Sequence, residues 1–103
     1  MKNHKITVSE KLLESRFVKT VKSWGGQCVK MESNLVSGLP DRMVLLHGAF
    51  VAFVEFKSTG EQPEPLQLLW HGKLRALGFK VYIVDSYETE KAAVTAIKED
   101  AGI

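Results

Sequence analysis

The sequence lacks the features that several protein classes need. A single cysteine, Cys28, excludes an internal disulfide, and no cluster of cysteine and histidine has the spacing of a zinc site. No run of about eighteen apolar residues is present to span a membrane, and no apolar stretch follows the polar first residues as in a signal peptide. No glycine-rich phosphate loop follows a predicted strand, so a nucleotide-binding regulator has no support. We therefore expect a protein of the cell interior, with Cys28 simply buried.

The composition predicts one compact domain. The chain has 103 residues, of which 45% are hydrophobic, which is enough for one core and too little for two. We assign the whole chain, residues 1–103, to this domain, with its core at about residues 9–98. The net charge of +2 permits nucleic acid as a partner without requiring it, because such binding depends on local phosphate contacts.

The first half of the chain predicts a helix and three strands. Residues 7–10 fit a capping box, so a helix should begin near Ser9 and end at Gly25 and Gly26. Apolar side chains then recur at helical spacing, at Leu13, Phe17, Val21 and Trp24. Strands are expected at residues 27–31, 41–46 and 50–57, with a polar loop at 32–39 before Pro40. The third strand is apolar on both faces up to Glu55 and should be central.

The second half predicts a helix, a strand and a final helix. Pro65 is well placed as the first residue of a helix that ends at Gly78. Its expected apolar face consists of Leu66, Leu69, Trp70, Leu74 and Leu77. A strand at residues 79–84 and an alanine-rich helix at about 87–98 follow, after which the chain should fray. The strand-helix-strand segment implies a parallel crossover, so the fold class is α/β, a mixed four-stranded sheet with helices on it.

Three ionisable residues lie where burial makes a charge expensive. Asp41 opens the second strand, and Glu55 and Lys57 close the central one. Because side chains alternate along a strand, Glu55 and Lys57 share a face, about 6.6 Å apart. A three-residue turn at 47–49 would place Asp41 directly opposite Glu55, with Cβ atoms about 4.5 to 5.5 Å apart. A two-residue turn would send Glu55 to the other face, so the chemistry predicts an odd-numbered turn or a bulge.

This arrangement suits phosphodiester hydrolysis. Two carboxylates and water suit a hard cation such as Mg²⁺, which polarises a phosphoryl oxygen and acidifies a bound water. A nearby lysine stabilises charge or positions the nucleophile. The alternative for Glu55 and Lys57 is a structural ion pair at the end of a strand.

Four segments of the sequence resemble one nuclease family. They are Gly-Leu-Pro-Asp at residues 38–41, Val-Glu-Phe-Lys at 54–57, Pro-Leu-Gln at 65–67 and Leu-Arg-Ala-Leu-Gly at 74–78. In this order they resemble the virus-type replication-repair nuclease (VRR-NUC) domain of the PD-(D/E)XK superfamily, over about residues 10–86. The resemblance implies a restriction-endonuclease-like αβββαβ core, to which this chain adds a C-terminal helix.

The resemblance also implies roles for individual residues. Asp41 and Glu55 would bind Mg²⁺ or Mn²⁺, the carbonyl of Phe56 would add a ligand, and Lys57 would assist attack by water. Gln67 matches a glutamine that contacts the site or the DNA backbone. The family places a glutamate on the first helix beside the site, and we choose Glu14, because Val18 and Val21 put it at the edge of the inward face. Glu10 has the capping explanation, and Glu14 has the alternative of an ordinary solvated residue.

Contacts with DNA are harder to assign. Our candidates are Lys30, Arg42, His71 and Arg75, although scattered basic residues are usually solvated surface. His71 shares the face of Gln67, and a polar helix surface explains it equally well. Trp24 and Trp70 are expected in the core or an interface rather than stacking on bases.

The expected function is therefore a Mg²⁺-dependent, structure-specific DNA endonuclease. The resemblance to small viral members of the family implies a homodimeric resolvase of four-way (Holliday) junctions, of phage type, acting in the cytoplasm of a bacterial host. Two symmetric sites would match two symmetric cuts. The alternatives are a flap or repair nuclease, and a noncatalytic DNA-binding subunit that keeps the fold.

Overall fold

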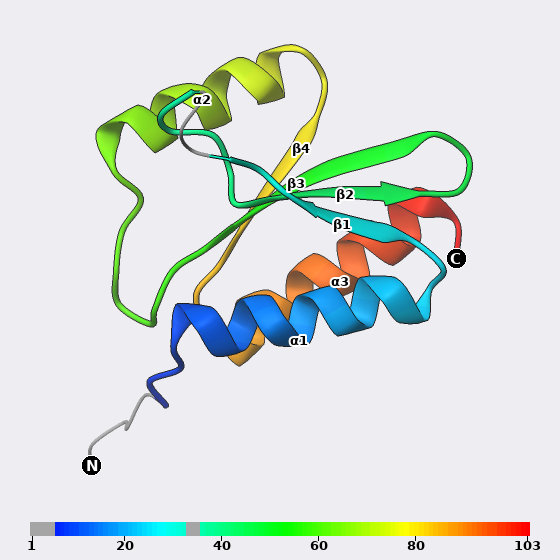
Figure 1. The fold of residues 1–103 in the computed structure, drawn as a ribbon, viewed down its shortest axis with the longest axis horizontal. Coiled ribbons are helices and arrows are strands. Elements are labelled where there is room, and N and C mark those ends of the chain that lie inside the picture. The colour runs from blue at the N-terminus through cyan, green and yellow to red at the C-terminus, as the bar shows by residue number, and fades with distance from the viewer. Residues whose placement is uncertain (1–5, 33–35) are drawn as a thin grey trace.

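A four-stranded sheet with helices on both faces forms the core of the computed structural model, which describes residues 6–32 and 36–103. The elements are α1 (Glu10–Ser23), β1 (Gln27–Lys30), β2 (Arg42–Leu46), β3 (Phe50–Phe56), α2 (Pro65–Ala76), β4 (Lys80–Val84) and α3 (Tyr87–Ala101). In Figure 1, α1 and α3 lie on one face of the sheet and α2 on the other. The predicted fold class is confirmed; residues 33–35 of the expected loop lie outside the described residues.

The sheet has the order β1-β2-β3-β4, so β3 is central as predicted. Strand β2 pairs in antiparallel with β1 and with β3, and β4 pairs with β3 in parallel after the crossover through α2. The turn between β2 and β3 has three residues, and Leu46 pairs with Phe50. Gly48 and Ala49 adopt positive φ angles of 81° and 61°, which allow this tight reversal. The predicted register is confirmed.

The alternation along β3 divides the core between the two faces. Ala52, Val54 and Phe56 pack against α1 and α3, and the ring of Phe56 meets that of Phe17 edge to face at 5.6 Å. Phe53 packs on the opposite side with Leu74 of α2. Glu55 follows the same alternation and therefore points to the α2 face.

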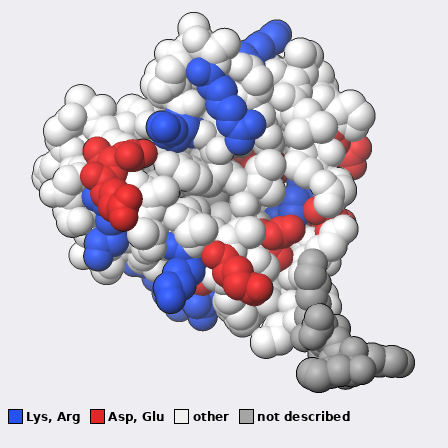
Figure 2. All heavy atoms as spheres, turned by 180° about the vertical axis from the view of Figure 1, so that it is seen from behind, with Lys and Arg blue, Asp and Glu red and all other residues white. Residues whose placement is uncertain are grey.

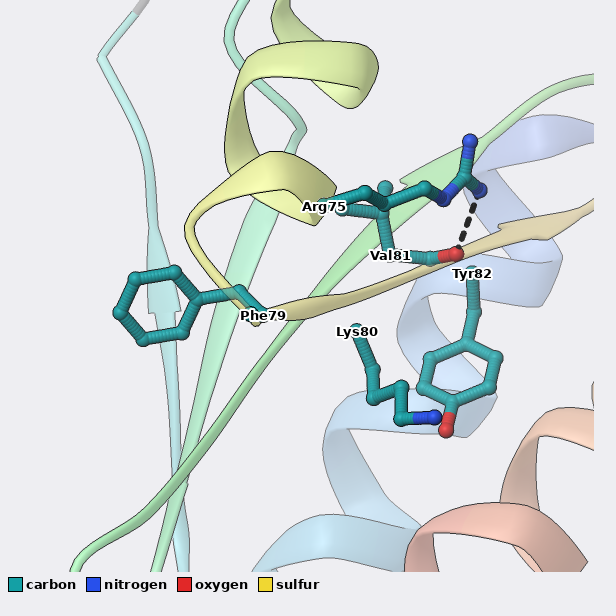
Figure 3. Close-up of a pocket in the computed structure, with 6 residues that line it drawn as sticks. Arg75, Phe79, Lys80, Val81 and Tyr82 are labelled. Atoms are coloured by element: carbon teal, nitrogen blue, oxygen red, sulfur yellow. Dashed lines mark hydrogen bonds between the residues drawn. The ribbon is translucent and has the colours of Figure 1, made fainter.

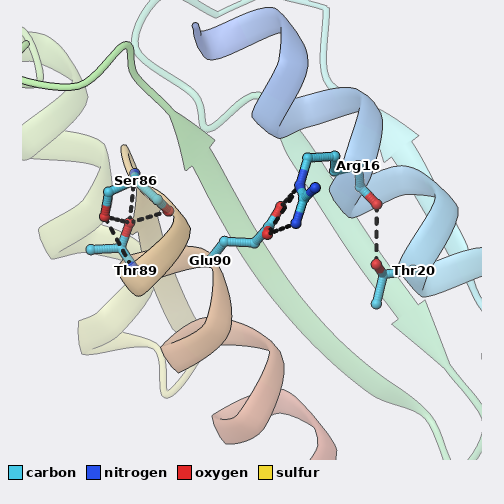
Figure 4. Close-up of polar contacts among 5 residues, drawn as sticks. All are labelled: Arg16, Thr20, Ser86, Thr89 and Glu90. Carbon is cyan, nitrogen blue, oxygen red and sulfur yellow. Dashed lines mark hydrogen bonds and ion pairs between the residues drawn. The ribbon is translucent and has the colours of Figure 1, made fainter. Parts of the chain in front are cut away.

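An ion pair fixes α1 against α3 (Figure 4). Arg16 donates from Nε and Nη2 to the carboxylate of Glu90, and the shortest of these bonds is 2.8 Å. At the start of α3, the hydroxyl of Ser86 accepts a bond from the amide of Thr89 at 3.1 Å. The start of α1 is capped in a similar way, because the hydroxyl of Ser9 accepts a bond from the amide of Leu12. The cap expected from Thr7 and Glu10 is thus wrong: Glu10 is the first helical residue and leaves its carboxylate free of that role.

Two expectations about the helices are corrected. On α2 the buried residues are His71 and Leu74, whereas Leu66, Leu69 and Leu77 are 44%, 52% and 75% exposed. The predicted apolar face of α2 is therefore mostly solvent-facing, because the end of the sheet that α2 covers presents Glu55 as well as apolar groups. The final helix continues to Ala101 instead of fraying after residue 98, since Gly102 takes a left-handed φ of 71° and caps it.

Candidate active site

The candidate site lies where the start of α1, the end of β3 and the start of α2 come together. Asp41 stands just before β2, one position beyond the last ladder pair of Arg42 with Val54, and so continues the register toward Glu55. Its Oδ2 accepts a bond of 2.8 Å from the amide of Phe56. The structure therefore brings Asp41 and the end of β3 together, as the sequence predicted.

Glu55 is almost completely buried, with 1% exposure. Its Oε2 accepts a bond of 2.6 Å from Nε2 of Gln67 and lies 3.7 Å from Nζ of Lys57. Its Oε1 has no hydrogen-bond partner among the described residues. Burial first, and then the charge of Asp41, raise the pKa of Glu55 to about 8. The positive charge near this carboxyl group is therefore too small to offset the effect of burial on its pKa.

Gln67 owes its position to the first turn of α2. Its Oε1 accepts a bond of 2.8 Å from the amide of Glu64, one of the free amides that begin a helix. The opposite end of the same amide then donates to Glu55. The side chain is therefore held at both ends, and the local sequence Glu-Pro-Leu-Gln at residues 64–67 sets its orientation toward Glu55.

His71 lies one turn further along α2 and is fully buried. Its Nε2 is 3.5 Å from Oε1 of Glu55, without hydrogen-bond geometry, and neither ring nitrogen has a hydrogen-bond partner among residues 6–32 and 36–103. Burial is the main cause that lowers the pKa of this imidazole. The expected place of His71 on a polar helix surface is therefore wrong, because its side chain has no accessible surface. Its expected contact with DNA stays a prediction that this burial disfavours.

Both glutamates at the start of α1 lie close to the site. Glu14 accepts a bond of 2.7 Å from Nε of Arg42, whose Nη1 also donates to the carbonyl of Cys28. Glu10 makes no side-chain bond in the described structure; burial, and next the charge of Asp41, raise the pKa of its carboxylate. Its amide donates to the hydroxyl of Ser58, just after β3, which ties α1 to the end of that strand. The sequence signal that we missed is Ser9, the true cap, which leaves Glu10 available.

The remaining DNA candidates occupy different places. Lys30 is exposed at the end of β1, and Arg42 is half-buried in its ion pair with Glu14. Arg75 projects from α2 beside a surface hollow of about 390 Å³, where its Nη2 donates to the carbonyl of Val81 at 2.7 Å (Figure 3). Trp24 packs partly buried against the core, as expected, and Cys28 is a buried free thiol.

The donor set fits a divalent cation. Asp41 and Glu55 supply oxygen ligands, and the unpartnered Oε1 of Glu55 is the kind of atom that such an ion satisfies. Within residues 6–32 and 36–103, no group of three or more His, Cys, Asp and Glu side chains forms a metal site by itself. Two carboxylates would therefore need a backbone carbonyl and water to complete the coordination shell.

Charge is dispersed on the face shown in Figure 2. Lys and Arg side chains lie among Asp and Glu there, with broad uncharged areas between them. This distribution agrees with the small net charge and locates no single basic patch on that face. No helix in the described part of the chain is long and apolar enough to cross a membrane.

Comparison with known proteins identifies the family. No family model matches the sequence. A curated relative from Acyrthosiphon pisum secondary endosymbiont phage 1, described as "Putative nuclease p44", is 40% identical over 81 residues, which are 79% of this chain and 87% of the relative. A solved structure described as a VRR_NUC domain matches with a TM-score of 0.75 and 26% identity, over 85% of this chain and 97% of that one. The chain therefore belongs to the VRR-NUC family of nucleases, in the PD-(D/E)XK superfamily.

Proposed function

We propose that this nuclease hydrolyses phosphodiester bonds in DNA with the help of Mg²⁺ or Mn²⁺, held by Asp41, Glu55 and the backbone carbonyl of Phe56. The observation that carries the proposal is the buried Glu55, whose Oε1 is unpartnered and whose neighbours across the register and along the strand are Asp41 and Lys57. The bound cation would polarise the phosphate and acidify an attacking water.

The chain's own residues would orient this chemistry. Lys57 would hold the attacking water or stabilise charge on the phosphate, because its side chain is 14% exposed and its ammonium lies 3.7 Å from Oε2 of Glu55. Gln67 would keep the Glu55 carboxylate in place through its bond to Oε2. Glu14 is our original choice for the acid on α1, but its carboxylate is occupied by Arg42. We therefore propose Glu10 as the acid nearer the reacting groups and Glu14 as the residue that positions Arg42.

The test is cleavage of linear and branched DNA with Mg²⁺, with EDTA and after Mg²⁺ is restored. Asp41→Asn and Lys57→Ala should lose activity, whereas Lys91→Ala, a control on the exposed side of α3, should keep it. Undiminished cleavage by both site variants would contradict the assignment. Retained DNA binding, together with the absence of both cleavage and Mg²⁺ binding, would instead support a noncatalytic subunit.

For the substrate we propose a four-way DNA junction, cut by a homodimer. Two copies of this domain give two sites for two symmetric cuts. On α2, Leu66, Leu68 and Leu69 leave apolar surface that a second copy would cover. Light scattering at assay concentration and mapping of both cuts test this. Paired cuts by a monomer would contradict it, and one-sided cutting of flaps would favour a repair nuclease.

A further inference from the structure

A groove between α1 and strands β1 and β2 gathers basic side chains outside the site described above. It encloses about 430 Å³. The charged residues that line it are Lys11, Glu14, Lys19, Lys22, Lys30 and Arg42. The lysines of α1 recur at spacings of eight and three residues, so they share one exposed side of the helix, away from its buried face of Leu13, Phe17 and Val21.

The charge of this groove is largely unneutralised. Glu14 is the one acidic residue in its lining, and its carboxylate is already bonded to Arg42 at 2.7 Å. None of the four lysines makes an ion pair within the described part of the chain. Four like charges on one concave surface repel one another, and a polyanion would relieve that repulsion.

The groove leads to the candidate active site. Lys30 and Arg42 are paired across β1 and β2, and Asp41 immediately precedes Arg42. The carbonyl of Asp41 accepts a bond of 2.9 Å from the amide of Met31, which continues the β1–β2 pairing to this point. One end of the groove is therefore a single residue away from a proposed metal ligand.

The length of the groove suits nucleic acid. Lys11 and Lys22 are eleven residues apart on α1, a rise of about 16 Å. This distance corresponds to about five base pairs of duplex DNA, at roughly 3.4 Å per pair. Lysines act as point charges toward phosphate, and phosphate contacts carry no sequence information. Val18 adds only an apolar wall.

We infer that this groove binds the phosphodiester backbone of DNA flanking the bond to be cut, through Lys11, Lys19, Lys22 and Lys30. The inference rests on the proposed function, because it takes DNA as the substrate of the neighbouring site. It assigns a sequence-independent contact, which fits recognition of DNA shape.

The experiment measures binding of fluorescent junction and duplex DNA by anisotropy, in EDTA and at several salt concentrations. The Lys19→Ala/Lys22→Ala variant is compared with Lys91→Ala/Lys98→Ala, which removes the same charge from α3. The pairs are matched, since Lys22 and Lys98 both lie in the last turn of their helices. The groove pair should weaken binding and flatten the slope of log K against log salt by about 0.9 per lost contact. The α3 pair should leave the slope unchanged.

A second variant and a separate cleavage assay make the outcomes distinct. Lys30→Gln, outside α1, should change the slope in the same direction. Equal salt slopes for the wild type and both groove variants would overturn the inference, as would equal losses of affinity for the groove pair and the α3 pair. In either case, Mg²⁺-dependent cleavage by the wild type would leave the proposed function intact. Absence of cleavage by the wild type, with the slope change present, would reject the proposed function and retain the groove as a DNA-binding surface.

Discussion

Oδ2 of Asp41 accepts a hydrogen bond of 2.8 Å from the backbone amide of Phe56. This bond joins the segment before β2 to the end of β3 and fixes Asp41 beside Glu55. It also has an energetic cost, because two carboxylates with raised pKa values then lie near each other, and the nearby charge of Lys57 offsets this only in part. A proposed metal ligand therefore has a structural role as well, and the two roles can be separated by mutation.

Substitution of Asp41 should separate activity from stability. Asp41→Asn keeps an oxygen that accepts the hydrogen bond from the Phe56 amide and removes the repulsion with Glu55. In EDTA this variant should therefore be at least as stable as the wild type, and with Mg²⁺ it should not cleave DNA. Asp41→Ala leaves the half-buried amide unsatisfied and should lose about 1 to 3 kcal/mol. Urea unfolding in EDTA measures both. Asp41→Asn as unstable as Asp41→Ala would show that the hydrogen bond is not the stabilising contact.

Gln67→Ala should reduce cleavage and metal affinity by about 10- to 100-fold, because the side chain that holds Oε2 of Glu55 is removed. The measurement is the Mg²⁺ concentration dependence of the cleavage rate. Gln62→Ala, an exposed glutamine of the preceding loop, is the control. Gln67→Ala that cleaves with unchanged Mg²⁺ dependence would remove Gln67 from the site.

Ala49→Gly should stabilise the protein by about 1 kcal/mol. Ala49 has a φ of 61°, a left-handed conformation that costs an alanine about 1 to 2 kcal/mol and a glycine much less. Chemical denaturation measures the change, and Ala92→Gly on the exposed side of α3 should destabilise by a similar amount. Destabilisation by Ala49→Gly would contradict the turn conformation on which the register depends.

Two glycines should respond in opposite ways to alanine. A Cβ at Gly26 would lie 2.8 Å from the carbonyl oxygen of Leu45 and would collide with the side chain of Leu46, so Gly26→Ala should cost about 1 to 3 kcal/mol. A Cβ at Gly72 meets nothing within 4 Å, and Gly72→Ala inside α2 should stabilise by about 1 kcal/mol. Thermal unfolding of both variants is the measurement. A neutral Gly26→Ala would refute the close approach of this turn to β2.

The sequence by itself determined the strand register and the placement of Asp41, Glu55 and Lys57. These features depend on local rules: side chains alternate along a strand, and a turn of three residues sets which positions face each other. Pro65 at the start of α2 and the cap that orients Gln67 are equally local.

Tertiary structure decided the rest, because the face of a helix that becomes buried depends on the element that packs against it. Apolar spacing favoured the leucines of α2 as its buried face, yet the partner surface there contains Glu55, and His71 is buried beside it. Leu74 is buried as well, whereas Leu66, Leu69 and Leu77 stay exposed. Our proposal of Glu10 rather than Glu14 rests on Arg42, which is 28 residues from Glu14 in the chain and bonded to it in the fold. No local pattern records such a contact, since it exists only once α1 packs against the sheet.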